Sequence, residues 1–213
     1  MQQLNFVPKH KIVHISIMTG KLEGLKAIST NTVTNPYCIK QNASNDSTNI
    51  CTKCYSHTML NTYRKNMQNS LERNTQVFSN GLIPSNDLPT IMEAFFRFNA
   101  HGELINEIHL INLVNIAIKN PHCNFALWTK RNDIIKKYFD SNIKPSNLIL
   151  IFSNSKISKV LKNPPLHFDK TFNNVLENEN IDIQNCTGQK CKDCLLCYKH
   201  NGITTIVEKV KKY

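Results

Sequence analysis

The stretch NLILIFS, residues 147–153, carries five consecutive apolar residues between two polar ends. Such a run is typical of a strand that is buried on both faces of a sheet. The stretches NFALWT at 124–129 and AFFRFNA at 94–100 also have strand character. Helical periodicity separates the three, in INEIHLINLVNIAIK at 105–119 and NDIIKKYFD at 132–140. This alternation predicts βαβ units and a parallel sheet that is covered by helices.

The predicted fold class is therefore α/β, either a partial TIM-like barrel or a parallel sheet with covering helices, plus a C-terminal cysteine-rich loop. We expect one domain over residues 1–213, with residues 185–200 as a metal-binding segment packed on it. Asn132 is the expected N-cap of the second helix. The remaining patterns predict strands at 11–18 and 203–207, a long polar loop at 30–50, one helix at 55–79 and a further helix from Pro89.

Polar side chains follow the three central strands of the predicted sheet. Parallel α/β sheets carry their sites beyond the C-terminal ends of the strands. We therefore expect a small anionic substrate or nucleotide to bind there, with Lys130 and Arg131 supplying charge and Asn99 orientation. The substrate-binding residues predicted on this basis are Arg97, Asn99, His101, Thr129, Lys130 and Ser153.

Eight cysteines fall into two groups and one isolated residue. Cys123 stands alone before an apolar strand, which predicts a buried structural thiol. An N-terminal group comprises Cys38, Cys51 and Cys54, and a C-terminal group comprises Cys186, Cys191, Cys194 and Cys197. These seven residues are the candidate metal ligands.

The C-terminal group has the spacing C-x4-C-x2-C-x2-C. A structural zinc site usually joins two C-x2-C knuckles across a dozen or more residues. Ligands on one short loop suit an iron–sulfur cluster better, because each thiolate can reach a different iron, and both C-x4-C-x2-C and C-x2-C-x2-C occur in such proteins. The sequence thus favours a [4Fe–4S] cluster over the alternatives of zinc and thiol redox chemistry.

The role of the N-terminal group of cysteines is less well defined by its spacing. Its C-x2-C pair, Cys51 and Cys54, resembles half a zinc knuckle or a redox pair at the start of a helix. Together the seven thiols could hold one cluster and a partial second one, or share a single site with some thiols as bystanders. Spacing alone does not apportion them, and it does not decide whether Cys38 is a ligand.

Composition bounds the class of protein. The chain carries 26 basic and 15 acidic residues, a formal net charge of +11. That charge favours nucleic acid and other polyanions, although an AT-rich genome encodes the same excess of lysine. No run of 18 apolar residues and no signal peptide in MQQLNFVPKHK are found, so we expect a cytoplasmic protein without a membrane partner. In a reducing compartment, clustered thiols bind metal more often than they form disulfides.

Several stretches, in this order, resemble the phage gene product 88 family. They are Thr19-Gly-Lys-Leu22, Cys51-Thr-Lys-Cys54-Tyr55, RFNAHGELIN at 97–106, NPHCNFALWTK at 120–130, KPSNLILIFSNS at 144–155 and NCTGQKCKDCLLCY at 185–198. The resemblance spans nearly the whole chain. It implies a phage or prophage origin and hence the host cytoplasm, and it brings no particular activity with it.

A weaker likeness connects the chain with radical-SAM proteins, which combine a partial α/β barrel with a C-x3-C-x2-C loop after the first strand. Cys38, Cys51 and Cys54 also follow the first predicted strand, and the likeness implies S-adenosylmethionine as a cofactor. The first gap here is twelve residues rather than three, and Lys53 replaces the aromatic residue that usually precedes the last cysteine. Both departures argue against that cofactor.

The expected function is that of a phage iron–sulfur protein, as an oxidoreductase or radical-type enzyme acting on a small anionic or nucleotide substrate. A zinc-bearing phage protein that binds nucleic acid or a host protein without catalysis is the alternative. That alternative predicts colourless protein, and for nucleic acid an affinity that falls steeply with salt.

Overall fold

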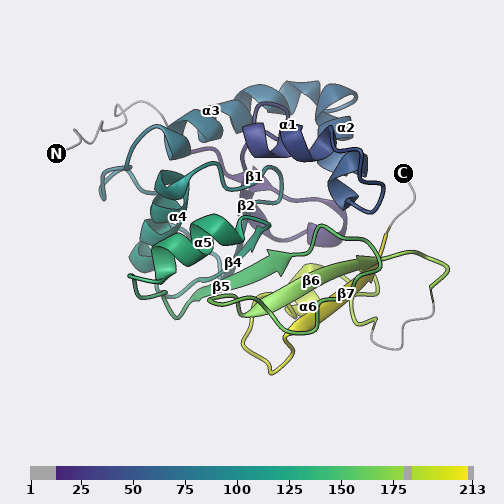
Figure 1. Ribbon diagram of the computed structural model, residues 1–213. Coiled ribbons are helices and arrows are strands. Elements are labelled where there is room, and N and C mark those ends of the chain that lie inside the picture. Colours follow the sequence, from purple (N-terminus) through teal and green to yellow (C-terminus); the bar gives the residue numbers. More distant parts are fainter. Residues whose placement is uncertain (1–12, 180–183, 211–213) are drawn as a thin grey trace.

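The computed structural model describes residues 13–179 and 184–210 (Figure 1). The segment MQQLNFVPKHK and the last residues of the basic tail lie outside these ranges, as does the start of the predicted strand at 11–18. Within them, no helix is both long enough and apolar enough to cross a bilayer.

One seven-stranded sheet organises the molecule, and its strands lie in chain order. The strands are β1 (Ser16–Ile17), β2 (Lys26–Ile28), β3 (Phe95–Phe98), β4 (Asn124–Thr129), β5 (Leu148–Ser153), β6 (Lys170–Val175) and β7 (Thr205–Lys209). The two-residue β1 pairs antiparallel with β2, and every other neighbouring pair is parallel. The sheet is not closed into a barrel, and the predicted parallel sheet with covering helices is confirmed.

Six α-helices and three short 3-10 turns accompany the sheet in the described ranges. The helices are α1 (Pro36–Asn42), α2 (Tyr55–Asn61), α3 (Gln68–Ser79), α4 (Glu107–Lys119), α5 (Asn132–Phe139) and α6 (Cys191–Cys194). The 3-10 turns are η1 (Gly20–Leu22), η2 (Ile50–Lys53) and η3 (Lys65–Met67).

The two faces of the sheet have different covers. Side chains alternate between faces along a strand, so Phe125 and Leu127 of β4 join the main core with α3, α4 and α5, while Ala126 and Trp128 face the other way. That second face is covered by the cysteine-rich segment, in which Tyr198 is buried. Figure 1 shows α6 beside β6 and β7. Both faces are covered, which accounts for the largely apolar sequences of β4 and β5.

Side-chain contacts connect the two edges of the sheet. Lys21 in η1, between β1 and β2, forms an ion pair of 2.6 Å with Glu208 of β7. Lys190, just before α6, donates to the carbonyl oxygen of Gly20 and pairs with Glu23. These contacts join the first and last strands of the sheet without a backbone ladder, so we name this junction the seam.

Two predictions for the first hundred residues are wrong in part. The polar stretch 30–50 contains α1, which begins because Asn35 accepts hydrogen bonds from the backbone N–H groups of Tyr37 and Cys38, with Pro36 at the first helical position. The helix predicted at 55–79 is interrupted at Thr62, whose backbone leaves the helical region and whose hydroxyl donates to the carbonyl oxygen of Thr58.

Two further helix starts differ from expectation. No helix begins at Pro89. The side chain of Asn120 binds the backbone of this segment instead: it accepts from the Ile91 N–H and donates to the Pro89 carbonyl. Asn132 is the first residue of α5 rather than its N-cap, a position that Arg131 occupies. Cys123, by contrast, is buried in the main core as predicted, and burial raises the pKa of its thiol to about 12.

His109 in α4 makes the stability of the fold depend on pH. It is fully buried against Phe78, its Nδ1 accepts from the Ile105 N–H, and burial lowers its pKa to about 3. The unfolded chain therefore binds a proton near pH 6.5 that the folded chain refuses until near pH 3, so stability is lost as pH falls through this window. We expect His109 to contribute about 2 kcal/mol to the loss of unfolding free energy between pH 7 and pH 5.

Urea denaturation at both pH values, in the wild type and in His109→Gln, measures this contribution. Gln keeps a polar side chain and cannot titrate, so the pH 7 to pH 5 difference should shrink. An unchanged difference in the variant would show that other groups carry the acid sensitivity.

Candidate functional site

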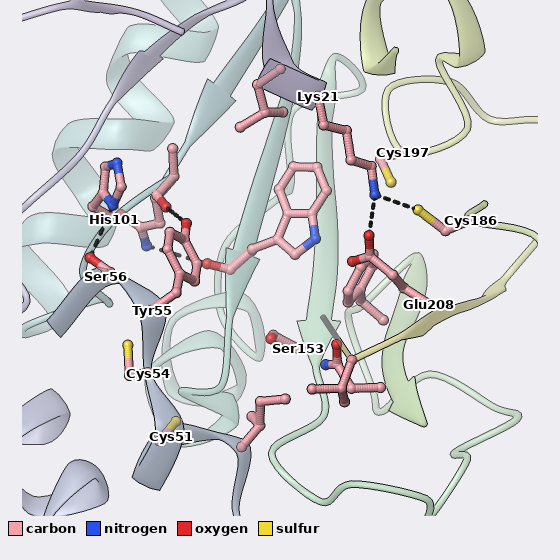
Figure 2. A pocket seen from close by; sticks show the side chains of 18 of the residues that line it. Lys21, Cys51, Cys54, Tyr55, Ser56, His101, Ser153, Cys186, Cys197 and Glu208 are labelled. Carbon is pink, nitrogen blue, oxygen red and sulfur yellow. Dashed lines mark hydrogen bonds and ion pairs between the residues drawn. The ribbon is translucent and has the colours of Figure 1, made fainter. Parts of the chain in front are cut away.

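A cavity of about 1400 Å³ lies at the C-terminal ends of the parallel strands. All seven candidate cysteines line it, together with Arg97, Asn99, His101, Lys130 and Ser153. Figure 2 shows Cys51 and Cys54 on one wall and Cys186 and Cys197 on the opposite wall, with Ser153 at the end of β5 between them. Residues from both ends of the chain and from the strand ends thus meet around one space.

Asparagine side chains hold the backbone of the N-terminal cysteine wall. Asn35 accepts from the Cys38 N–H at 3.3 Å, and Asn49 accepts from the Cys51 N–H at 3.0 Å. Asn42 donates to the carbonyl oxygen of Cys51 at 2.9 Å. Asparagine side chains of the stretch 30–50 therefore hold the backbone of Cys38 and Cys51 in place.

Lys130 supplies the positive charge of this wall. Its ammonium donates to the hydroxyl of Ser153 at 2.9 Å. Burial by itself lowers the pKa of Lys130, but the nearby Cys51 and Glu103, which are anionic when deprotonated, more than offset this, so the pKa lies above its ordinary value. Burial raises the pKa of the Cys38 and Cys51 thiols, and Lys130 opposes that rise. Lys130 is thus the counter-charge for thiolates formed here.

Glu103 fixes the loop that carries Lys130. Its buried carboxylate accepts hydrogen bonds from the hydroxyl of Thr129 and from the backbone N–H groups of Lys130 and Leu104. Burial raises the pKa of Glu103, against these hydrogen bonds. Thr129 therefore lies behind the cavity rather than in its lining, as a support for Glu103.

Arg131 turns away from the cavity. Its guanidinium binds Asp133, donates to the carbonyl oxygens of Leu104 and Ile105, and lies over the ring of Tyr37. The charge expected from Lys130 and Arg131 together therefore comes from Lys130 alone of these two.

His101 and Asn99 occupy the end of β3. His101 shares a hydrogen bond of 2.9 Å between its Nδ1 and the hydroxyl of Ser56, which in turn bonds to Thr32. Burial lowers the pKa of His101 to about 4, so the ring is neutral at pH 7. Asn99 has a left-handed backbone, φ 57°, and donates to the Trp128 carbonyl. Both residues line the cavity from the segment that follows β3.

The C-terminal cysteine wall packs on the second face of the sheet. Cys191 and Cys197 pack against a buried cluster that includes Trp128 and Tyr198, whose ring centroids are 5.8 Å apart. Cys186 is held beside β7 by a parallel bridge to Glu208. Cys194 is exposed, and the other three thiols are buried or half-buried.

Two cations face this wall. The ammonium of Lys21 lies 2.7 Å from the Cys186 sulfur. Arg97 stacks over Trp128 at 3.9 Å, and its charge opposes the rise in pKa that burial causes at Cys191 and Cys197. The buried Nε of Arg97 has no hydrogen-bond partner among the described residues. The free N–H of Arg97 near the Cys191 and Cys197 thiols favours an anionic group at this place in the cavity.

The donor set is compatible with a metal cluster held by thiolates. All eight cysteines are free thiols. Burial raises the pKa of the Cys38 thiol on one wall and of the Cys197 thiol on the other, so a metal that binds them has to displace their protons. Among the described residues, no three His, Cys, Asp or Glu side chains are arranged to hold a metal ion. The ligands of a cluster bind separate irons, whereas the ligands of a mononuclear zinc converge on one ion.

Lys21 and Trp128 are cavity residues that the sequence did not predict. Lys21 lies within Thr19-Gly-Lys-Leu22, far from its partners along the chain, and no local pattern marks it. Trp128 offers a signal: it is the single tryptophan and ends an apolar strand on the face opposite to Phe125.

Fold and cavity together define an α/β protein whose open, mostly parallel sheet carries a cysteine-lined site at its C-terminal edge. The chain belongs to the Gene product 88 family, whose model matches residues 19–182 and so includes Cys38, Cys51 and Cys54. This confirms the resemblance to the phage family of that name. No curated protein and no solved structure matches the chain.

Proposed function

We propose that this phage protein binds iron–sulfur cofactor in the cavity and acts as a redox or radical-type enzyme on a small anionic or nucleotide substrate in the host cytoplasm. One observation carries the proposal: seven free cysteines, from segments more than a hundred residues apart, line a single space. A purely structural metal site has no need of a cavity of this size.

The charges around the thiols support the proposal of an iron–sulfur cofactor. Thiolates are the donors that iron–sulfur clusters take, and a cluster with its ligands is anionic. Lys130 faces the N-terminal wall, and Arg97 and Lys21 face the C-terminal wall. When bound, a cluster supplies single electrons. The protein's own groups hold the ligands, offset their charge and keep water from the apolar side that Trp128 and Tyr198 form.

The lining of the space between the walls supports the proposed class of substrate. Arg97 and Lys130 place positive charge on both sides of it, and the neutral His101 and Asn99 offer hydrogen bonds. A cavity lined by fixed cations raises the local concentration of anions. Small anions, including nucleotides, are therefore the substrate class that the lining favours.

Metal and sulfide analysis of anaerobically purified protein tests the proposal. We expect brown protein with a broad visible absorption band and with iron and acid-labile sulfide in near-equal amounts. Cys197→Ser is expected to lower the iron content, whereas Cys123→Ser, which changes the thiol buried away from the cavity, should not.

Colourless protein that retains stoichiometric zinc, and that gains no iron on anaerobic reconstitution, would overturn the proposal. That result would favour the zinc-bearing protein that binds nucleic acid or a host protein. Binding of nucleic acid could then be measured as a function of salt, because the net charge of +11 predicts a steep dependence.

A further inference from the structure

We infer that Arg97 and Tyr198 form an oxyanion site where the cysteine-rich segment packs on the sheet, and that this site takes a terminal carboxylate or phosphate group. The inference deepens the proposed function and rests on it, because it assigns the anionic part of the substrate to one place in the cavity. It also gives the cysteine-rich segment a second role, since Tyr198 belongs to that segment.

Arg97 carries its charge on the covered second face of the sheet. Side chains alternate along β3, so Arg97 faces the same way as Phe95 and away from the main core. Its register partner on β4 is Ala126, and its guanidinium carbon lies 3.9 Å from the ring centre of Trp128. A charge that is placed among apolar side chains costs free energy unless an opposite charge accompanies it.

No described carboxylate supplies that opposite charge. Lys21, another cation of the lining, forms an ion pair with Glu208. Arg97 forms no ion pair with a carboxylate of residues 13–179 or 184–210, and its buried Nε has no hydrogen-bond partner there. The partner that Arg97 lacks is therefore an acceptor with negative charge.

Tyr198 brings a second open donor to the same place. Only 1% of its surface is exposed, and its buried hydroxyl forms no well-aligned hydrogen bond with a described residue. Its ring centre lies 5.8 Å from that of Trp128 and 6.2 Å from that of Phe95, so Tyr198 packs on the neighbours of Arg97. The guanidinium can only donate, so its approach to the Tyr198 hydroxyl still leaves the hydroxyl hydrogen without an acceptor.

Two buried donors that share a missing acceptor indicate the chemistry of the ligand. Buried polar groups without a partner cost free energy, and most such groups in folded proteins are therefore paired. The planar guanidinium presents its N–H groups as a fork that matches two oxygens of a carboxylate or phosphate. Trp128 covers one face of the guanidinium and leaves the edge with the N–H groups for the ligand. A compact oxyanion therefore satisfies Arg97 and Tyr198 together.

The rival role of Arg97 is to offset the charge of a cluster held by Cys191 and Cys197. That role requires a positive charge, and it requires neither the fork of a guanidinium nor the hydroxyl of Tyr198. The two roles therefore differ in what Arg97→Lys and Tyr198→Phe are expected to do.

Equilibrium dialysis with radiolabelled inorganic phosphate and radiolabelled acetate, at constant ionic strength, measures the affinity of the whole chain as purified. We expect the wild type to bind at least one of these anions at a single site. Binding of phosphate alone assigns a phosphoryl group to the site, and binding of acetate alone assigns a carboxylate. Wild-type protein that binds neither anion would overturn the inference.

Tyr198→Phe removes the hydroxyl and keeps the ring. It is expected to weaken anion binding roughly tenfold, the effect of losing one hydrogen bond to a charged group. Without anion, its free energy of unfolding should equal or exceed that of the wild type, because no hydrogen bond is lost. Tyr138→Phe, at a half-buried tyrosine outside the cavity lining, is the matched control and should leave the affinity unchanged. Wild-type affinity in Tyr198→Phe, or a loss of stability without anion, would overturn the inference.

Arg97→Lys keeps the charge and removes the fork. It is expected to retain the iron content and to weaken anion binding roughly tenfold. Wild-type affinity in this variant would show that charge alone is sufficient, as in the rival role, and would overturn the inference. Iron and sulfide measured in the same samples keep the two proposals apart. Anion binding by protein that takes up no iron would reject the proposed cofactor and leave the oxyanion site standing, and iron-loaded protein that binds neither anion would do the reverse.

Discussion

Gly102→Ala is expected to lower the free energy of unfolding by about 3–5 kcal/mol, from left-handed strain and a backbone clash together. Gly102 has φ +77°, and a Cβ there would lie 2.2 Å from the hydroxyl oxygen of Thr30 and 2.6 Å from its carbonyl oxygen. The chain cannot move aside at low cost. The Thr30 N–H donates to the His101 carbonyl, and the Gly102 N–H donates to the Thr32 hydroxyl.

Gly202→Ala is the matched control for that variant. Gly202 has nearly the same backbone, φ +74°, and a Cβ there would meet nothing within 4 Å. Its loss should be limited to the strain of the backbone, about 1 kcal/mol. Urea denaturation of both variants compares them directly, and equal losses would show that the contact with Thr30 yields without cost. Because Gly102 follows His101, the first variant should also disturb the cavity.

Glu103→Ala is expected to cost about 3–5 kcal/mol of unfolding free energy. The substitution leaves three donors without their acceptor: the Thr129 hydroxyl and the backbone N–H groups of Lys130 and Leu104. It also removes the buried negative charge that helps keep Lys130 protonated. The free energy of unfolding should therefore fall.

Glu107→Ala provides the comparison for Glu103. Glu107 forms its ion pair with Lys137 at the surface, where such pairs contribute little, about 0–1 kcal/mol. Thermal and urea unfolding of both variants will show whether burial and hydrogen bonding, rather than the loss of one carboxylate, set the cost. A loss at Glu103 no larger than that at Glu107 would mean that water replaces its hydrogen bonds.

The central strands could be predicted from sequence because burial on both faces leaves a direct signature. β4 matches its predicted bounds, and β5 begins one residue later than predicted. β6, with the sequence KTFNNV, was not predicted, since a strand with two adjacent asparagines lacks that signature. Asn173 is nonetheless fully buried, because it accepts hydrogen bonds from Asn154 and from the Leu161 N–H. Tertiary partners of this kind are invisible to local patterns.

Single residues of the candidate site could be predicted from the sequence, but the way in which they come together could not. Cysteine spacing identified all seven cysteines of the lining, and strand ends identified Arg97, Asn99, His101, Lys130 and Ser153. The apposition of the two cysteine groups, and the contact of Lys21 with Cys186, join residues far apart in sequence. Such pairings depend on how the sheet curls, which no local periodicity reports. Thr129 and Arg131 show the converse, since polar residues at strand ends can turn inward to support the scaffold.

The seam between the first and last strands has a consequence for how the molecule responds to its medium. In a closed barrel, backbone hydrogen bonds join the first strand to the last, and dissolved ions hardly weaken them. Here the gap is spanned by half-buried and exposed charges, Lys21 with Glu208 and Lys190 with Glu23. Dissolved ions screen such pairs, the exposed one most strongly. The contact between the two edges of the sheet should therefore weaken as ionic strength rises.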